Sequence, residues 1–362
     1  MAIDDVSARI IAQSRSAGSY ALYRLPEERC YVYVGQSGAP VELDSLTRVG
    51  QQRGLVIAPF QPTPSEPIVL IRPDTLLVAQ LPEAISTDAI PYTDDTDLQQ
   101  QRYEAGFVVC KRRLCEQPAL RKVVYARRLN LAFTSAQRVD ALQLFIKACL
   151  QHPHSYVSLW ATPATGTWLV ATPETLLRQD VAQPMRWHTM ALAGTMPWRG
   201  HLPPLEAWSA KNREEQACVT AYIHRRLEGL VCDMSVHGCR SVRSASVVHL
   251  RTDIDFRLRD GVSLGAVIGR LHPTPAVCGE SLMAARSAIR AAEAMSRRYY
   301  AGFSGPVGLA GHTGLYVSLR CMELKGSGAS LYAGGGLLAA SQLADEWDET
   351  CRKLQPMLRL FS

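Results

Sequence analysis

The chain has 362 residues, with 39 Lys and Arg against 33 Asp and Glu, which gives a formal net charge of +6. Hydrophobic residues make up 47% and charged residues 20% of the chain, which excludes an intrinsically disordered protein and predicts one large domain or two closely packed ones. Because the basic residues are scattered and aromatic residues reach only 7%, we expect no nucleic-acid partner, whereas an anionic small molecule is compatible with the charge.

The cysteines and the first residues indicate the compartment. The ten cysteines include no CxxC pair, which argues against a zinc ribbon or a thioredoxin-like redox site. Most of them lie in apolar segments, as free thiols in a reducing environment do. The start, MAIDDVSARI, is not typical of a signal peptide, and no apolar stretch approaches the length of a membrane span. We therefore expect a cytoplasmic protein without a membrane partner, as a monomer or weak dimer.

The first part of the chain, residues 1–100, is expected to be a strand-rich region that packs on the same domain as the rest. Apolar runs predict strands at 31–35, 55–60 and 68–73. The segment APFQPTPSEP at 58–67 predicts an extended loop, because its four prolines cannot continue a regular element. No arrangement of catalytic residues is visible in this region.

Residues 101–362 carry a denser pattern of elements. The segment RKVVYARRLNL alternates in strand fashion and places Lys122, Val124 and Ala126 on one face. Thr134 or Ser135 is a candidate cap for the helix that follows, through about residue 151. Further strands are predicted in YVSLWA and TWLVATP and at 246–258, 314–324 and 329–337, and helices at roughly 97–115, 211–229, 279–297 and 345–355. Antiparallel-looking strands with helices between the groups predict an α+β fold.

Glu215 is the first candidate for chemistry. It lies four residues before Val219, at the start of an apolar stripe that continues through Tyr222 and Ile223, so the helix turns it inward. A carboxylate in such a place is costly unless it is paired or binds a metal. The alternative is an ordinary first-turn glutamate that the helix dipole favours.

The last predicted helix carries a second acidic group. Glu346, Glu349 and Lys353 follow one another at spacings of three and four residues, so Glu349 and Lys353 could be a plain surface ion pair. The helix follows the segment LYAGGGL, however, whose glycines allow a ligand to approach the backbone closely. Carboxylates from separate helices are ligands that suit magnesium.

Single residues elsewhere are weaker candidates. The loop LHPTPAVCG at 271–279 is stiff and displays Thr274, although it could be only a structural turn. Gly194 lies in LAGT, where a side chain could be intolerable. Glu174 follows a proline at the end of a strand and is expected to be an exposed acid. His249 lies within a strand, where a histidine is more often part of a satisfied core than a catalytic group.

Ten segments taken together resemble one family, the chorismate-utilising enzymes. They are KVVYAR, ATPETLL, LAGTMPWRG, KNREEQ, VVHLRT, LHPTPAVCG, YYAGFSGPVG, LRCMEL, LYAGGGL and EWDETCRKL, and their order and spacing match over roughly residues 100–360. The resemblance implies a fold of two large antiparallel sheets packed into a core with helices outside. It also implies chorismate as substrate and magnesium as cofactor. Members of the family include anthranilate, aminodeoxychorismate, salicylate and isochorismate synthases.

Two positions distinguish among these members of the family. Family members that use water as nucleophile have a lysine as general base at the position of Lys122, and members that use ammonia do not. Ala193 stands where aminodeoxychorismate synthases typically carry a lysine. The resemblance therefore implies an isochorismate synthase that feeds menaquinone or siderophore biosynthesis. The nearest alternative is a salicylate synthase, which eliminates pyruvate from isochorismate in the same site.

The resemblance also implies roles for individual residues. Glu215 and Glu349, with Glu346, would hold magnesium against the ring carboxylate of chorismate. Lys122 would take a proton from the water that attacks C2, and Glu174, with a raised pKa, would protonate the leaving C4 hydroxyl. The residues implied in substrate binding are Gly194, His249, Thr274, Tyr300, Arg320, Gly334, Gly336 and Lys353.

Two functions of other kinds remain as alternatives. The first is a non-catalytic chorismate-binding module, against which the intact Lys122, Glu174 and metal-site glutamates argue. The second is an anthranilate-type lyase with a glutaminase partner, against which Lys122 argues.

Overall fold

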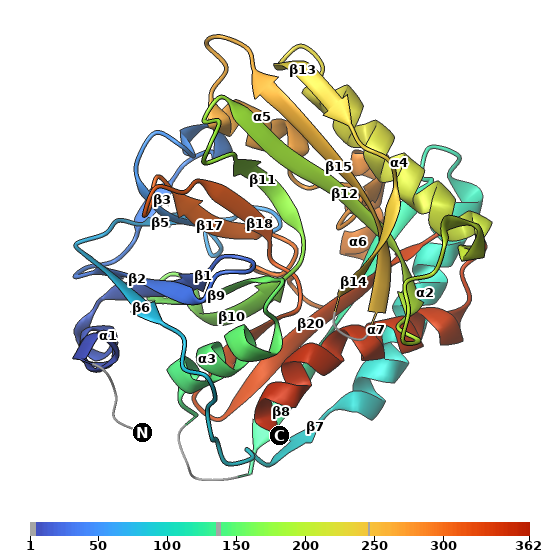
Figure 1. Ribbon diagram of the computed structural model, residues 1–362. Coiled ribbons are helices and arrows are strands. Elements are labelled where there is room, and N and C mark those ends of the chain that lie inside the picture. Colours follow the sequence, from blue (N-terminus) through green and yellow to red (C-terminus); the bar gives the residue numbers. More distant parts are fainter. Residues whose placement is uncertain (1–4, 135–138, 245–246) are drawn as a thin grey trace.

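The computed structural model describes residues 5–134, 139–244 and 247–362 (Figure 1). Two antiparallel β-sheets of ten strands each form the centre of this part of the chain. Seven α-helices accompany the sheets within the described residues. The predicted α+β architecture, with two large antiparallel sheets and helices outside, is confirmed.

Each sheet combines strands from distant parts of the sequence. Sheet A has the order β16 (Gly279–Glu280), β8 (Lys122–Phe133), β20 (Gly328–Leu337), β19 (Cys321–Lys325), β10 (Gly166–Thr172), β9 (Tyr156–Thr162), β1 (Ser19–Arg24), β2 (Cys30–Gln36) and β6 (Thr75–Gln80), with β7 (Tyr92–Asp94) also on β8. Sheet B has the order β13 (Val231–Val236), β15 (Val247–Leu258), β12 (Arg186–Pro197), β11 (Thr175–Gln179), β18 (Gly314–Val317), β17 (Phe303–Val307), β4 (Gly54–Ala58), β5 (Ile68–Ile71) and β3 (Val41–Leu43), with β14 (Arg240–Ser244) also on β15. Strands of the first hundred residues thus extend both sheets.

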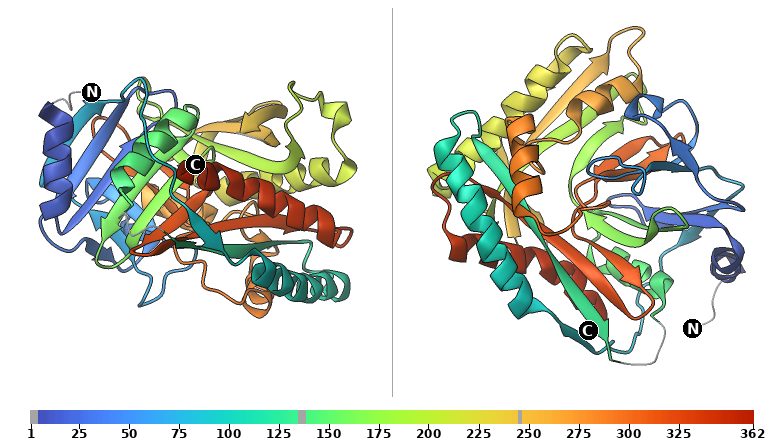
Figure 2. Two further views of the ribbon diagram at one scale, coloured as in Figure 1. Left: turned by 90° about the horizontal axis from the view of Figure 1, so that it is seen from below. Right: turned by 180° about the vertical axis from the view of Figure 1, so that it is seen from behind.

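The helices cover the outer faces of the sheets. They are α1 (Asp5–Ser16), α2 (Thr96–Glu116), α3 (Ala141–Gln151), α4 (Ala210–Leu227), α5 (Leu264–Leu271), α6 (Leu282–Ala292) and α7 (Leu343–Leu358), with short 3-10 turns at Leu46–Arg48, Leu205–Ala207 and Arg359–Phe361. Helix α4 packs on β12 and β15 of sheet B, whereas α2 and α6 pack on β8 and α7 packs on β20 of sheet A (Figure 2). No helix in the described ranges is long and apolar enough to cross a membrane.

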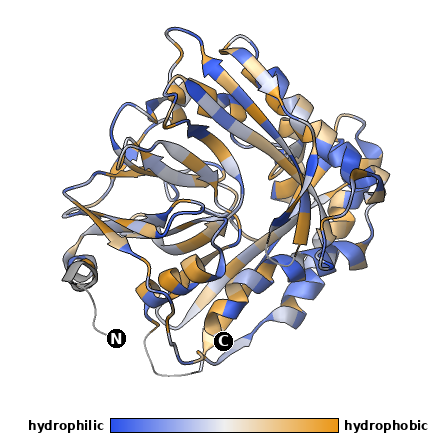
Figure 3. Cartoon of the chain, viewed as in Figure 1, coloured by the Kyte–Doolittle hydropathy of each residue, from blue (hydrophilic) through white to orange (hydrophobic). Residues whose placement is uncertain are grey.

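The main hydrophobic core lies between the two sheets. Trp160 and Trp168 of sheet A and Ile254 and Phe256 of sheet B are all fully buried in one cluster. Burial of such large side chains is worth about 1.5–3 kcal/mol each, so this contact is a main source of stability. Figure 3 shows hydrophobic residues along the strands of both sheets. The packing of the two sheets against each other also holds in place the strand ends that surround the candidate site.

The predicted start of the helix that runs to about residue 151 is wrong. Helix α3 begins at Ala141, and its cap is Asp140, whose side chain accepts hydrogen bonds from the backbone N–H groups of Leu142 and Gln143. Thr134 is therefore not the cap, and Ser135 lies outside the described residues. The expectation failed because several capping residue types stand near this start, and the sequence does not show which of them is used.

Two further expectations need correction. The helix predicted over 279–297 is shorter, because Gly279–Glu280 pairs with β8 as strand β16 and α6 ends at Ala292. The strand predicted over 314–324 is divided into β18 and β19. Arg320, between the two strands, has a φ of +46°, which an extended strand does not allow. This break turns Arg320 toward the candidate site.

Candidate functional site

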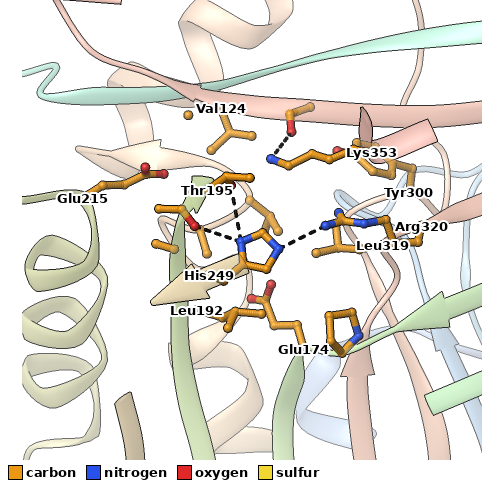
Figure 4. A pocket seen from close by; sticks show the side chains of 17 residues that line it. Val124, Glu174, Leu192, Thr195, Glu215, His249, Tyr300, Leu319, Arg320 and Lys353 are labelled. Carbon is orange, nitrogen blue, oxygen red and sulfur yellow. Dashed lines mark hydrogen bonds between the residues drawn. The ribbon is translucent and has the colours of Figure 1, made fainter. Parts of the chain in front are cut away.

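A pocket lies between the two sheets and gathers most of the residues singled out from the sequence (Figure 4). The free space in it that a water-sized sphere can reach is about 50 Å³. Its lining includes Glu174, Gly194, Glu215, His249, Tyr300, Arg320, Gly334, Gly336 and Lys353. Residues from separate segments of the sequence therefore meet in one cavity, including some that the local sequence patterns do not predict to be buried.

Glu174 lies between β10 and β11 and lines this pocket. The expectation of an exposed acid is wrong, because only 4% of the residue is accessible to solvent. Burial raises the pKa of its carboxyl to about 7, although the positive charges of Lys122, Arg320 and Lys353 act in the opposite direction. No ion-pair partner lies within 4.0 Å of it in the described part of the chain. A carboxyl in this setting can donate a proton near neutral pH.

His249 and Arg320 form the centre of the pocket wall. The His249 ring lies with Nδ1 2.8 Å from the carbonyl oxygen of Gly194, and Arg320 Nη2 lies 3.2 Å from Nε2 (Figure 4). Burial and the charge of Arg320 lower the pKa of His249 to about 3, so the ring is neutral and carries its proton on Nδ1. His249 thus accepts a hydrogen bond from Arg320 and orients it.

Arg320 itself has no acidic partner within 4.0 Å among the residues described, although only 8% of it is accessible to solvent. A buried guanidinium without a carboxylate is costly. It offers a planar set of donors to a carboxylate group entering the pocket. This residue is therefore a candidate anchor for an anionic ligand.

Gly194 interrupts strand β12 at a bulge, where the register shifts between Ala193 and Met196. Its φ is +65°, and a Cβ at this position would lie 3.2 Å from Cβ of Asn212 on α4. Glycine is needed here both for the left-handed backbone conformation and for the close approach of the helix. The structure thus gives a backbone reason for the glycine that LAGT suggested.

Glu215 of α4 faces the buried Lys122 of β8. Nζ of Lys122 lies 2.8 Å from Oε1 of Glu215, and the Lys122 side chain is only 1% accessible. The ammonium makes no hydrogen bond of good geometry with any described residue, so the contact is an ion pair defined by distance. A Cβ on Gly336 would lie 2.4 Å from Oε1 of Glu215 and 2.8 Å from Cε of Lys122. Glycine in β20 therefore makes room for this pair, and Glu215 is more than a helix-dipole residue.

The carboxylates of α7 lie over the neighbouring glycine of β20. A Cβ on Gly335 would be 3.1 Å from Oε2 of Glu346 and 3.4 Å from Oε1 of Glu349. Lys353 lies 2.5 Å from Oε1 of Glu349 and donates a hydrogen bond to the carbonyl oxygen of Gly334. The side chains of Glu349 and Lys353 are only 18% and 12% accessible, so they are not a plain surface pair.

These carboxylates fit a divalent cation. Oε2 of Glu346 is buried and has no hydrogen-bond partner among the described residues. Burial, together with the charge of Glu349, raises the pKa of Glu346, although the charge of Lys211 acts in the opposite direction. Within the described ranges, no three His, Cys, Asp or Glu side chains gather at metal-binding spacing. Magnesium nevertheless uses only one or two protein carboxylates and completes its shell with water and substrate oxygens, so the residues present suit it.

The remaining candidates divide into two groups. Tyr300 lines the pocket beside Gly334, because its hydroxyl oxygen is 2.9 Å from where a Gly334 Cβ would be. Thr274 does not line it, but its loop reaches the pocket through Ala276 and Val277. The hydroxyl oxygen of Thr274 is buried and has no partner in the described part of the chain.

Sequence reasoning missed several contributors. Val124, Leu192, Thr195 and Leu319 line the pocket, and Lys211 pairs with Glu346 at 2.5 Å. Val124 could have been identified from the sequence, because it shares the strand face of Lys122. Lys211 could have been identified from its position one turn before Glu215 on α4.

The sequence matches the family model for chorismate-binding enzymes over residues 74–362. This chain belongs to the chorismate-binding enzyme family. The match begins within the first hundred residues, earlier than the segments quoted from the sequence.

Curated relatives of this chorismate-binding enzyme include three isochorismate synthases. DhbC of Bacillus subtilis is 31% identical over 255 residues, which is 66% of this chain and 63% of the relative. EntC of Escherichia coli K12 is 29% identical over 67% of this chain and 63% of the relative. The salicylate biosynthesis isochorismate synthase of Pseudomonas aeruginosa is 35% identical over 59% of this chain and 46% of the relative. The chain thus matches between about half and two thirds of the length of these relatives.

Solved structures share the fold of this chorismate-binding enzyme over nearly its whole length. The menaquinone-specific isochorismate synthase MenF of Escherichia coli superposes with a TM-score of 0.77 at 23% identity, covering 100% of this chain and 92% of that one. Anthranilate synthase component I of Streptococcus pneumoniae gives a TM-score of 0.71 at 14% identity, covering 99% of both chains. At these identities the likeness concerns the fold, and it includes enzymes of different activity.

Proposed function

We propose that this protein is an isochorismate synthase, which converts chorismate to isochorismate by adding water at C2 and removing the C4 hydroxyl. The observation that carries the proposal is a buried acid in the pocket with a buried lysine near enough for its charge to act on the pKa of the acid. Glu174 has a pKa raised to about 7 by burial, and Lys122 is buried on β8, whose Val124 lies on the other side of the pocket (Figure 4). A buried acid with a buried candidate base nearby suits a reaction that adds and removes water.

Relatives add support of a different kind. Bacillus subtilis DhbC, Escherichia coli EntC and the Pseudomonas aeruginosa relative all carry isochorismate synthase in their names. Lys122 also distinguishes the water-using members from those that use ammonia. The product would feed menaquinone or siderophore biosynthesis in the cytoplasm, with no macromolecular partner and as a monomer or weak dimer.

The proton transfers would balance within the pocket. Lys122, once it has lost the proton that it carries in the ion pair with Glu215, would take one proton from the attacking water, and Glu174 would give one proton to the departing hydroxyl, which leaves as water. The ring double bonds shift between the two events, so the product is an isomer of the substrate. Over one turnover Lys122 gains one proton from the attacking water and Glu174 loses one proton to the departing hydroxyl, and exchange with solvent restores both groups.

Binding would use the fixed cations of the pocket. Arg320, oriented by the neutral ring of His249, would hold a carboxylate of the substrate together with Tyr300. Lys353, Thr274, Gly194 and the backbone at Gly334 and Gly336 would complete the surface around the ring. Such fixed groups lower the barrier by holding substrate and proton donors in a reactive geometry.

Glu215 and Glu349, with Glu346, would hold magnesium. The ion, when bound, would neutralise and orient the ring carboxylate of chorismate. The glycines Gly335 and Gly336 contribute by leaving room for these carboxylates beside β20. The protein would thus place the anionic end of the substrate near β20 and its C4 hydroxyl near Glu174.

Chorismate turnover by the purified protein, with and without magnesium and with the products separated by liquid chromatography, tests the proposal. We expect isochorismate in the presence of magnesium and none after treatment with a chelator. Pyruvate and salicylate would instead identify a salicylate synthase, and labelled ammonia in the product would identify an anthranilate-type lyase. Binding of chorismate without any product would identify a non-catalytic module.

A further inference from the structure

Three lysines accompany the three carboxylates beside β20. Lys122 pairs with Glu215, and Lys353 pairs with Glu349. Both of these lysines have proposed roles toward water or substrate. The third, Lys211, pairs with Glu346 and has no role in the reaction described above.

Lys211 lies at the start of α4, one turn before Glu215, so the helix directs both side chains to the same side. Its Nζ is 2.5 Å from Oε1 of Glu346 on α7. The Glu346 side chain is 2% accessible and that of Lys211 is 33% accessible, so the ammonium reaches in from the rim to an almost fully buried acid. The second oxygen of Glu346 has no hydrogen-bond partner among the described residues.

Lys211 also acts on the other two carboxylates. Burial lowers its pKa, but the charges of Glu346, Glu215 and Glu349 outweigh this and raise it. All three candidate metal ligands thus favour the protonated form of one lysine. The ammonium stands where it neutralises the group of carboxylates as a whole.

We propose that Lys211 is a resident counter-ion, which occupies the carboxylate cluster in the metal-free protein and is displaced when a divalent cation binds. The three carboxylates and three ammonium groups balance in charge, so a divalent cation that binds without substrate adds two uncompensated charges. Moving Lys211 away from Glu346 frees a carboxylate oxygen and relieves part of that repulsion. Lys211 is then a positioning residue, which keeps Glu346 and Glu349 together without metal and lowers the affinity for metal. This inference rests on the proposed metal site.

A purely structural role for Lys211 makes a different prediction. If the ion pair only ties α4 to α7, its removal destabilises the protein equally with and without metal. If Lys211 competes with the metal, its removal destabilises the metal-free protein and strengthens metal binding. Measuring both quantities without any substrate separates the two roles.

Titration of the metal-free protein with Mg²⁺ by calorimetry at pH 8 is the test, together with thermal unfolding with and without saturating Mg²⁺. We expect Lys211→Met to lower the dissociation constant for Mg²⁺ about tenfold relative to wild type, because one competing charge is gone. Lys211→Arg keeps the charge and is expected to stay within about threefold of wild type. The unfolding temperature of Lys211→Met should be below wild type without Mg²⁺, and the deficit should shrink when Mg²⁺ is saturating.

Lys325→Met is the matched control, because Lys325 is half exposed and pairs at 3.7 Å with Glu323 away from the carboxylate cluster. It should bind Mg²⁺ like wild type. If Lys211→Met does not fold, Lys211→Gln replaces it with the same expectations. An unchanged or weaker affinity in the variant, or an equal stability deficit with and without Mg²⁺, overturns the proposal. Absence of Mg²⁺ binding in wild type overturns it through the metal assignment, whereas product analysis on chorismate tests the proposed activity separately.

Discussion

The two ends of the pocket use the same kind of residue in opposite ways. Beside β20, the carboxylates of Glu215, Glu346 and Glu349 each lie within 2.8 Å of a lysine ammonium. Near β11, Glu174 is buried but has no ion-pair partner among the described residues. The difference shows that the surroundings, and not the residue type, decide whether a glutamate is an anion or a proton donor.

The directions in which the pKa values of Glu349 and Glu174 are shifted express this contrast. At Glu349, burial raises the pKa, but Lys353 and Lys211 more than offset it and bring it below the usual value. At Glu174, burial dominates over cations that are farther away and raises the pKa to about 7. One end is therefore suited to hold a cation and the other to release a proton.

Replacement of Lys122 should have the largest effect. The change Lys122→Ala removes the proposed base and leaves Glu215 without its close cation, so we expect the turnover number for chorismate to fall by about 10³–10⁴. Steady-state kinetics measure the loss, and circular dichroism checks that the fold persists. Lys325→Ala, which removes a half-exposed lysine, should remain active. A Lys122→Ala enzyme with a tenth of the wild-type rate would show that the base lies elsewhere.

Glu174→Gln should be the next most severe change. An amide keeps the shape of the side chain but has no acidic proton to give, so we expect the rate to fall by about 10²–10³. In wild type, kcat/KM should decline as the pH rises through about 7, because Glu174 loses its proton there. The pH–rate profile of the variant's residual activity should lack this decline. A decline that persists in the variant would assign it to another group.

The sequence predicted the sheets and the open space beside β20 better than the burial of Glu174. Strand alternation and the glycines of LYAGGGL are local signals, so the face of Lys122 and the open space at Gly336 could be anticipated. The burial of Glu174 depends on how β10 and β11 meet a second sheet, which no local pattern records. Local spacing alone left Glu215 and Glu349 ambiguous, and it was the ordered set of motifs that suggested their roles.

The stability of the Glu174→Gln variant provides an independent check on the same end of the pocket. Because the folded-state pKa is raised above the unfolded value, the neutral acid stabilises the fold at low pH, and this contribution is lost as the pH rises from about 4.5 to about 7. Relative to the variant, wild type should lose up to about 3 kcal/mol over that range. Thermal unfolding at pH 5 and pH 8 should show a gain for the variant that is larger at pH 8, by about 3 °C. The same difference at both pH values would contradict a raised pKa.

Gly194→Ala should have the smallest effect, and it tests how the two ends are joined. The residue needs a left-handed conformation, which costs alanine about 1–2 kcal/mol, and its new methyl group would lie 3.2 Å from Cβ of Asn212. Gly200→Ala is the matched control, because Gly200 also has a positive φ but no atom within 4 Å of the added Cβ. Urea unfolding should show a loss in both variants and a greater one at Gly194. Because Asn212 precedes Glu215 by one turn, only Gly194→Ala should also weaken Mg²⁺ binding, by a factor of about three. Equal Mg²⁺ affinity in both variants would mean that β12 does not position the start of α4, and that the carboxylate end of the pocket is set by sheet A alone.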